Sequence, residues 1–245
     1  MTDFLETPQG RRIAYHKTEG QGPTVVFLGG FASDMEGTKA VHLEAWARAQ
    51  GRAFLRFDYS GHGESSGRFT DGCIGDWATD AAEVIGATTS GPLVLVGSSM
   101  GGWISLLTTK RMGDRIAGLV GIAAAPDFTE DGYWASFDEA QRLAIEMVGH
   151  VEVPSDYGDP FVITRRLIED GRSQLVLRDP LPLPFPVRFL QGTEDEAVSR
   201  ATALRLLDHV TGDDVRLTLV KGADHRFSTP ECLALIESAL AEVLP

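Results

Sequence analysis

The fold of this protein is decided by the stretch Gly97-Ser98-Ser99-Met100-Gly101, which follows the apolar run Leu93-Val94-Leu95-Val96 and precedes a helical pattern. A short apolar run bounded by turn residues is typical of a buried strand, so the sequence predicts a strand, a tight turn and a helix in succession. In that setting the pattern Gly-x-Ser-x-Gly forms a nucleophile elbow, whose turn holds the central hydroxyl at the mouth of the sheet. The frame centres on Ser99 and not on Ser98, so Ser99 is the candidate nucleophile.

Two glycines, Gly97 and Gly101, frame this turn. A side chain at either position is expected to collide where the strand and the helix come close together. The alternative is a chance match, since such pentapeptides also occur in loops rich in glycine and serine. The strand before the turn and the helix after it disfavour that alternative.

Length and composition indicate one globular domain. The chain has 245 residues, of which 43% are hydrophobic and 23% are charged, without an internal repeat or a low-complexity linker. Its net charge of -13 argues against nucleic acid and anionic membranes as partners, because both require a basic face. No stretch of about 18 uncharged apolar residues is present, so we expect no membrane span.

The expected location is the cytoplasm. The first residues, Met1-Thr2-Asp3-Phe4-Leu5-Glu6, have neither the basic nor the apolar region of a secretory signal. Cys73 and Cys232 lie far apart and match no metal-binding spacing, so they are expected to be reduced thiols. Neither a metal nor an organic cofactor is expected, and the sequence carries no signal of oligomeric state.

Strand patterns alternate with amphipathic helical patterns along the chain. Near-continuous apolar strands separated by helices predict an α/β fold, with a mostly parallel central sheet and helices on both faces. The economical interpretation is a single domain over residues 1–245. The predicted strands are 11–15, 24–28, 53–57, 93–96, 118–123, 187–190 and 215–220, and the predicted helices are 39–50, 77–85, 100–111, 200–210 and 231–243.

One long interval, from Ala124 to Pro186, interrupts this alternation. At about sixty residues it exceeds one crossover helix, so residues 126–183 are expected to form a cap insertion above the carboxyl edge of the sheet. Two helical patterns are predicted inside it, over 137–148 and 160–171. The apolar residues of the cap either line an acyl pocket or pack the cap onto the body. The candidates for substrate binding are Trp134, Phe137 and Met147, and the apolar set also includes Tyr133, Val148, Tyr157 and Phe161.

A serine hydroxyl needs a general base, and position separates the six histidines. His225 lies in the loop Gly222-Ala223-Asp224-His225-Arg226-Phe227 after the last predicted strand, from which a side chain can reach back toward Ser99. It is therefore the candidate base. The remaining histidines are expected to be structural or exposed to solvent: His16, His42, His62, His150 and His209.

The base in turn needs a carboxylate that orients its ring and stabilises the imidazolium. The loop after the strand 187–190 offers three neighbouring carboxylates, Glu194, Asp195 and Glu196. Asp224 lies next to the base in sequence. It would face elsewhere if His225 faces the nucleophile, so we expect it either to support the residues that contact the substrate or to structure its own loop.

An acyl-transfer transition state also requires hydrogen-bond donors for its oxyanion, each worth about 3 kcal/mol. One expected donor is the backbone N–H of Met100, directly after the nucleophile. The other is expected from the loop Gly29-Gly30-Phe31 after the strand 24–28, where we choose the N–H of Phe31. The two glycines can also serve the turn from strand to loop, and both roles are compatible.

Together these features resemble the α/β-hydrolase superfamily over essentially the whole chain. The resemblance implies the chain order serine, acid, histidine. The family pattern Gly-x-x-Asp-x-x-Val then falls on Gly192 and Asp195, so Asp195 is the preferred acid, with Glu194 and Glu196 as alternatives. The family's nucleophile and base fall on Ser99 and His225.

A closer likeness is to the group of depalmitoylating thioesterases that also act as acyl-glucuronide esterases. It is carried by residues 30–40, 56–65, 96–103 and 224–226. Unlike that group, this protein is expected to have no transit peptide, which would fit a bacterial-type cytosolic relative. It also has Gln191 where many superfamily members have histidine. The likeness does not identify the substrate, because function on this fold lies in the cap and the pocket.

The sequence therefore predicts a serine hydrolase that cleaves carboxylic esters or acyl thioesters through an acyl-enzyme. Small-molecule esters or thioesters are the expected partners, and S-acylated proteins are a further candidate. A serine peptidase, an acyltransferase or a carbon–carbon bond hydrolase would use the same three residues. A non-catalytic binding protein of this fold would be expected to lack one of them. A dehalogenase or epoxide hydrolase would carry aspartate at position 99, which Ser99 disfavours.

Overall fold

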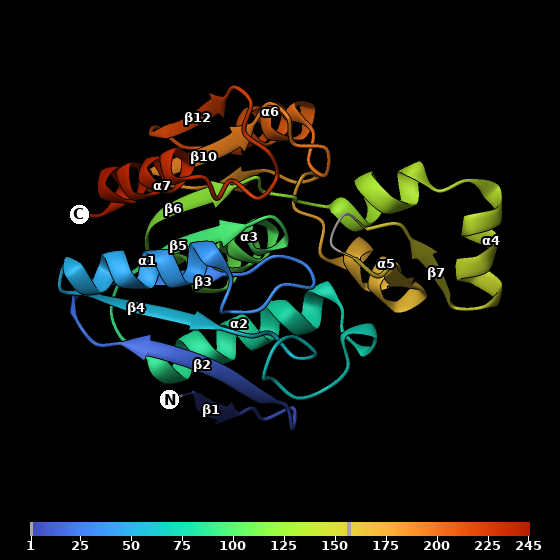
Figure 1. Ribbon diagram of the computed structural model, residues 1–245, viewed down its shortest axis with the longest axis horizontal. Coiled ribbons are helices and arrows are strands. Elements are labelled where there is room, and N and C mark those ends of the chain that lie inside the picture. The colour runs from blue at the N-terminus through green and yellow to red at the C-terminus, as the bar shows by residue number, and fades with distance from the viewer. Residues whose placement is uncertain (1, 156–157) are drawn as a thin grey trace.

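The computed structural model describes residues 2–155 and 158–245, and within these residues eight strands form one central sheet. The strand order is β1-β2-β4-β3-β5-β6-β10-β12 (Figure 1). The pairs β1–β2 and β2–β4 are antiparallel, and the remaining neighbours are parallel, which confirms the predicted mostly parallel sheet. The strands are β1 (Asp3–Glu6), β2 (Arg12–Thr18), β3 (Gln21–Leu28), β4 (Arg52–Phe57), β5 (Leu93–Ser98), β6 (Ile116–Ile122), β10 (Val187–Gly192) and β12 (Val215–Val220). The sequence did not predict β1, an edge strand that lacks a buried apolar run.

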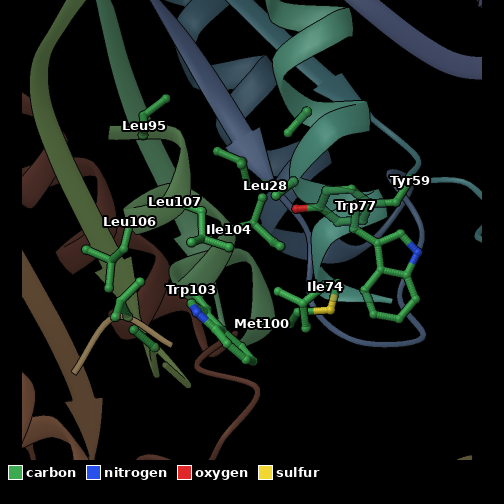
Figure 2. Close-up of a cluster of buried hydrophobic side chains, with 14 of the residues drawn as sticks. Leu28, Tyr59, Ile74, Trp77, Leu95, Met100, Trp103, Ile104, Leu106 and Leu107 are labelled. Atoms are coloured by element: carbon green, nitrogen blue, oxygen red, sulfur yellow. The ribbon is translucent and has the colours of Figure 1, made fainter. Parts of the chain in front are cut away.

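Helices cover both faces of this sheet. One face carries α1 and α7, and the other carries α2, α3 and α6. Side chains of β3 alternate between the two layers, so that Val25 packs toward α1 and α7 while Val26 packs toward α2 and α3. Figure 2 shows the second core, where Trp77 of α2 and Ile104 of α3 lie near Leu28. The helices are α1 (Thr38–Ala49), α2 (Ile74–Thr88), α3 (Met100–Met112), α6 (Arg200–His209) and α7 (Pro230–Val243), with short 3₁₀ turns at Phe69–Asp71 and Gly113–Arg115.

The interval between β6 and β10 extends beyond the carboxyl ends of the strands as a lobe of its own (Figure 1). We call residues 126–183 the cap segment. It contains a π-helical turn (Phe128–Trp134), α4 (Glu139–Met147), β7 (His150–Val153), β8 (Phe161–Thr164), α5 (Arg165–Ser173) and β9 (Leu181–Pro182), which pairs with β11 (Val210–Thr211). Across the described chain, every helix is too short or too polar to cross a bilayer.

The structure corrects the helix predicted over 160–171. Residues 161–164 form β8, which pairs antiparallel with β7, and the helix α5 starts only at Arg165. The sequence Phe-Val-Ile-Thr is rich in aromatic and β-branched residues, which favour a strand. The helix then begins where the hydroxyl of Thr164 accepts a hydrogen bond from the N–H of Leu167. The predicted helix over 137–148 is present as α4, with Asp138 as its cap.

The two ends of the cap segment are joined by one buried carboxylate. Asp127, which is fully buried, accepts hydrogen bonds from the N–H of Val176 at 2.8 Å and of Leu177 at 3.0 Å. The guanidinium of Arg178 contacts the same carboxylate at 3.1 Å. Burial raises the pKa of Asp127 above its ordinary value. This cluster therefore holds together the two chain segments that join the cap segment to the body, around residues 127 and 176–178. We call these two segments the neck.

The turn between β5 and α3 has the geometry that the two framing glycines predict. Ser99 has φ 55° and ψ -119°, a strained conformation for a residue with a side chain. A Cβ atom added at Gly97 would lie 2.3 Å from the backbone oxygen of Gly101, and one added at Gly101 would lie 1.9 Å from the oxygen of Leu28. The collision expected at both glycines is confirmed.

Gly101→Ala should lower the free energy of unfolding by about 3 kcal/mol or more, because its methyl group overlaps the backbone of β3. Urea denaturation measures the change. Gly113→Ala is the matched control, since a Cβ at Gly113 meets nothing within 4 Å. Equal stability of the two variants would contradict the close approach of α3 and β3.

Asp127→Ala should lower the free energy of unfolding by about 2 to 4 kcal/mol, because two buried N–H groups lose their acceptor. Limited proteolysis should then cut the cap segment faster than in the wild type. The exposed Asp208 supplies the control, Asp208→Ala. Unchanged proteolysis of Asp127→Ala would show that the neck does not depend on this carboxylate.

Candidate active site

Three side chains from distant parts of the chain form one line of hydrogen bonds. Ser99 lies on the turn between β5 and α3, and its Oγ is 3.1 Å from Nε2 of His225. His225 lies in the loop after β12, and its Nδ1 is 2.9 Å from Oδ2 of Asp195. Asp195 lies in the loop after β10. A hydroxyl, an imidazole and a carboxylate in this order can pass a proton from the serine to the histidine.

The loop after β10 presents Asp195, and not its neighbours, to His225. The Asp195 side chain is fully buried, whereas Glu194 and Glu196 are exposed. Oδ1 of Asp195 accepts hydrogen bonds from the N–H of Ala197 at 2.9 Å and of Val198 at 2.8 Å. The aspartate selected by the sequence pattern is therefore the one that the structure brings to the histidine.

Hydrogen bonds keep this buried carboxylate ionised. Burial acts to raise the pKa of Asp195, but hydrogen bonds from His225, Val198 and Gln191 outweigh it and lower the pKa below its ordinary value. An ionised acceptor fixes which nitrogen of His225 carries the proton. Nδ1 donates to Asp195, so Nε2 is left to accept from the hydroxyl of Ser99.

The loop after β3 lies directly against the serine. A Cβ atom added at Gly30 would lie 3.5 Å from Cβ of Ser99. Among the described residues, neither the N–H of Phe31 nor that of Met100 has a hydrogen-bond acceptor. Two N–H groups next to a nucleophile and without a partner can serve an oxyanion.

His62 supports this loop, a role that the sequence analysis did not assign to it. Its ring is buried against Phe69 and Trp77, and its Nε2 accepts a hydrogen bond from the N–H of Ala32 at 3.3 Å. Nδ1 then carries the proton and donates to the backbone oxygen of Ser60 at 3.2 Å. Burial lowers the pKa of His62 to about 4, so the ring stays neutral and keeps its acceptor. The only sequence signal was the Gly61-His62-Gly63 turn.

A cavity of about 780 Å³ opens at Ser99 and His225. It lies between the carboxyl ends of the strands and the cap segment. Its lining contains a set of apolar, mostly aromatic side chains, here called the apolar wall, and a set of polar side chains, here called the polar wall. The apolar wall includes Phe31, Phe128, Tyr133, Val153 and Phe161, and the polar wall includes Asp34, Thr38, Lys39, Glu196, Arg226 and Ser228.

The ring of Phe31 is the centre of the aromatic wall. It contacts Phe69 of the body at a centroid distance of 4.7 Å. It also contacts Phe128 at 5.6 Å and Phe161 at 5.4 Å, both in the cap segment. The residue whose N–H lies beside the serine therefore also joins the body to the cap segment.

The polar wall includes a half-buried lysine near the loop of the histidine. Nζ of Lys39 donates a hydrogen bond to the backbone oxygen of Arg226 at 2.5 Å. Burial lowers the pKa of Lys39 to about 8. Asp224 accepts a hydrogen bond from the N–H of Phe227, so it structures its own loop as expected. Among the described residues, no group of three or more His, Cys, Asp or Glu is arranged to hold a metal ion.

The structure does not bring the three cap candidates for substrate binding into this cavity. Trp134, Phe137 and Met147 are absent from the described residues that line the cavity. The ring of Trp134 lies under the guanidinium groups of Arg142 and Arg172. Phe137 is buried and stacks on Tyr133 behind the wall, and Met147 is 77% exposed at the end of α4. Within the wider apolar set, Tyr133 and Phe161 do line the cavity, Val148 is exposed, and Tyr157 lies outside the described residues.

Sequence comparisons relate this chain to known hydrolases. A family model described as serine aminopeptidase, S33 (Hydrolase_4), matches residues 21–165. The mitochondrial palmitoyl-protein thioesterase ABHD10 of Mus musculus is 34% identical over 243 residues, which cover 98% of this chain and 82% of the relative. ABHD10 of Homo sapiens is 32% identical over 243 residues, which cover 98% of this chain and 79% of the relative.

Solved structures agree with this relationship. The mouse alpha/beta hydrolase domain-containing protein 10 has a TM-score of 0.92 at 32% identity, and the match covers 99% of this chain and 97% of that one. A crystal structure from Agrobacterium vitis S4 has a TM-score of 0.96 at 37% identity and covers 100% of this chain and 99% of that one. The chain therefore belongs to the Hydrolase_4 family of α/β-hydrolases.

Proposed function

We propose that this protein is a serine hydrolase that cleaves carboxylic esters or acyl thioesters through an acyl-enzyme on Ser99. The observation that carries the proposal is the continuous hydrogen-bonded line from Ser99 through His225 to Asp195. A second support is the open cavity at the hydroxyl of Ser99, which gives a substrate carbonyl access to it.

The chemistry follows from the proton positions. Oγ of Ser99 attacks the substrate carbonyl carbon while Nε2 of His225 takes the hydroxyl proton. Asp195 stabilises the imidazolium that forms. The N–H groups of Met100 and Phe31 donate to the oxyanion. His225 then gives its proton to the leaving alcohol or thiol, and in a second round it activates the water that releases the acid.

The acyl chain of the substrate is expected to lie against the cap segment, because the cap residues of the apolar wall suit an apolar group. Aromatic and aliphatic side chains of the cap segment exclude water from an apolar chain. The polar side, with Lys39 and Arg226, suits a more hydrophilic leaving group. The named activity of the ABHD10 relatives supports S-acyl substrates, either small thioesters or S-acylated proteins. A cytoplasmic location stays a prediction from the sequence.

Amide hydrolysis is a second candidate, and the description of the matched family model as serine aminopeptidase favours testing it. Two carboxylates on the cavity wall, Asp34 and Glu196, would be available to a substrate amino group. Lys39 and Arg226 on the same wall oppose that role through like charge. Esters and thioesters also have better leaving groups than amides. Ester, thioester and aminoacyl anilide substrates of matched chain length separate these activities.

Ser99→Ala should remove turnover while leaving the fold intact, because only the nucleophilic oxygen is lost. The measurement pairs intact mass after fluorophosphonate treatment with hydrolysis of p-nitrophenyl esters and S-acyl thioesters of increasing chain length. The wild type should gain one adduct, located on Ser99, and the variant none. Turnover retained by Ser99→Ala would overturn the assignment. An unlabelled, inactive wild type would instead favour a binding protein.

Asp195→Asn should lower kcat by about 10⁴-fold with little change in the melting temperature, because an amide in this place no longer holds Nδ1 of His225 protonated. The neighbouring Glu194→Gln is the matched control and should retain wild-type kcat. The opposite pattern, with the loss in Glu194→Gln, would make Glu194 the acid that orients His225.

A further inference from the structure

Gln191, the fifth residue of β10, lies beside the carboxylate of Asp195. Its side chain is buried, with 1% of the residue exposed. Nε2 donates hydrogen bonds to Oδ2 of Asp195 at 2.9 Å and to the backbone oxygen of Val198 at 3.0 Å. The oxygen of Gly192 lies at 3.3 Å from the same nitrogen. Three acceptors around one nitrogen determine which way the amide group faces.

The other atom of this amide is left without a partner. Oε1 of Gln191 is buried and has no hydrogen bond to any described residue. A flipped amide would bring Oε1 against three oxygen atoms, which disfavours it. An unpaired buried acceptor destabilises a fold, and the hydrogen bonds of the amide N–H offset that cost.

Oδ2 of Asp195 is shared by two donors. It accepts from Nε2 of Gln191 and also from Nδ1 of His225, each at 2.9 Å. The two donors therefore compete for the charge of one oxygen. We propose that Gln191 is a positioning residue that orients the Asp195 carboxylate and limits how strongly it stabilises the protonated form of His225. This inference rests on the proposed function, in which His225 is the general base.

The direction of the effect follows from the charges. The N–H of Gln191 places a partial positive charge next to the oxygen that stabilises the imidazolium. Without it, Oδ2 carries more charge for His225, and the imidazolium becomes more stable. The base then needs a higher pH to become available. The same hydrogen bond therefore orients the carboxylate and limits its stabilisation of the imidazolium.

The remaining charged groups near His225 are unchanged by a substitution at Gln191. They come from the loop of His225 itself, from the start of α1 and from the loop after β10. Asp195 faces Nδ1 directly. The other groups are Asp224 and Arg226 beside the histidine, Lys39 bound to the oxygen of Arg226, and Glu196 on the cavity wall.

The test is Gln191→Met, which keeps the length of the side chain and removes the donor. The acid limb of kcat/KM for a p-nitrophenyl ester should move to higher pH by about half a unit to one unit, as expected for one hydrogen bond to a charged group. The downfield Nδ1–H proton signal of His225 in NMR should move further downfield. Gln141→Met, the same change on α4 in the cap segment, should leave both readouts unchanged.

Gln191→Asn gives a second variant if the methionine does not fold. It keeps an amide but is one methylene too short to reach Oδ2, so the same upward shift is expected. A lower melting temperature with an unmoved acid limb and an unmoved proton signal would overturn the inference and leave only a structural role. The NMR signal does not require turnover. A wild type without turnover would therefore reject the proposed function, while a shifted signal would still support the link between Gln191 and His225.

Discussion

The strained turn at Ser99 is the constraint on which the rest of the site depends. A left-handed φ at a residue with a side chain costs about 1 to 3 kcal/mol and persists only where neighbours hold it. Here the N–H of Ser99 donates to the oxygen of Ile122 at 2.9 Å, and the oxygen of Ser99 accepts from the N–H of Ala125 at 3.0 Å and of Gly102 at 2.9 Å. The end of β6 therefore clamps the turn from one side, while β3 approaches Gly101 from the other. The hydroxyl is presented at the sheet edge because the backbone has no room to relax.

The parallel sheet brings together residues that lie far apart in the sequence. Ser99 and His225 are 126 residues apart and share a hydrogen bond, because the loops after β5 and β12 leave from the same edge. The loop after β10 adds Asp195, and the loop after β3 adds Phe31. Buried polar partners then hold these loops in place. His62 accepts from the loop after β3, and Gln191 donates into the loop after β10. Neither residue touches the serine, yet each determines where a group beside the serine points.

The cap segment is attached to the body at few points, and only some of its elements face the cavity. It is fastened at its neck by Asp127, and its inner surface is joined to the body through the ring of Phe31. Its helix α4 has only one buried residue, Ile145, so most of its apolar side chains face away from the cavity. The cap residues of the apolar wall come instead from the π-helical turn and from the strands β7 and β8. The helix predicted over 160–171 would have pointed a different set of side chains toward the cavity, because alternate residues face the same side in a strand but not in a helix.

The sequence by itself determined the α/β class, the nucleophile turn, the order of serine, acid and base, and most element boundaries in the body. These features depend on local signals: apolar runs for buried strands, glycines where backbones meet, and loops at the ends of parallel strands. Only the tertiary structure decided that His62 supports the loop of Phe31 and that Met147 faces solvent. A histidine in a turn does not show which loop its ring will support, and an amphipathic pattern does not tell which partner an apolar face will meet. Those choices depend on packing between segments far apart in the chain, which local signals do not contain.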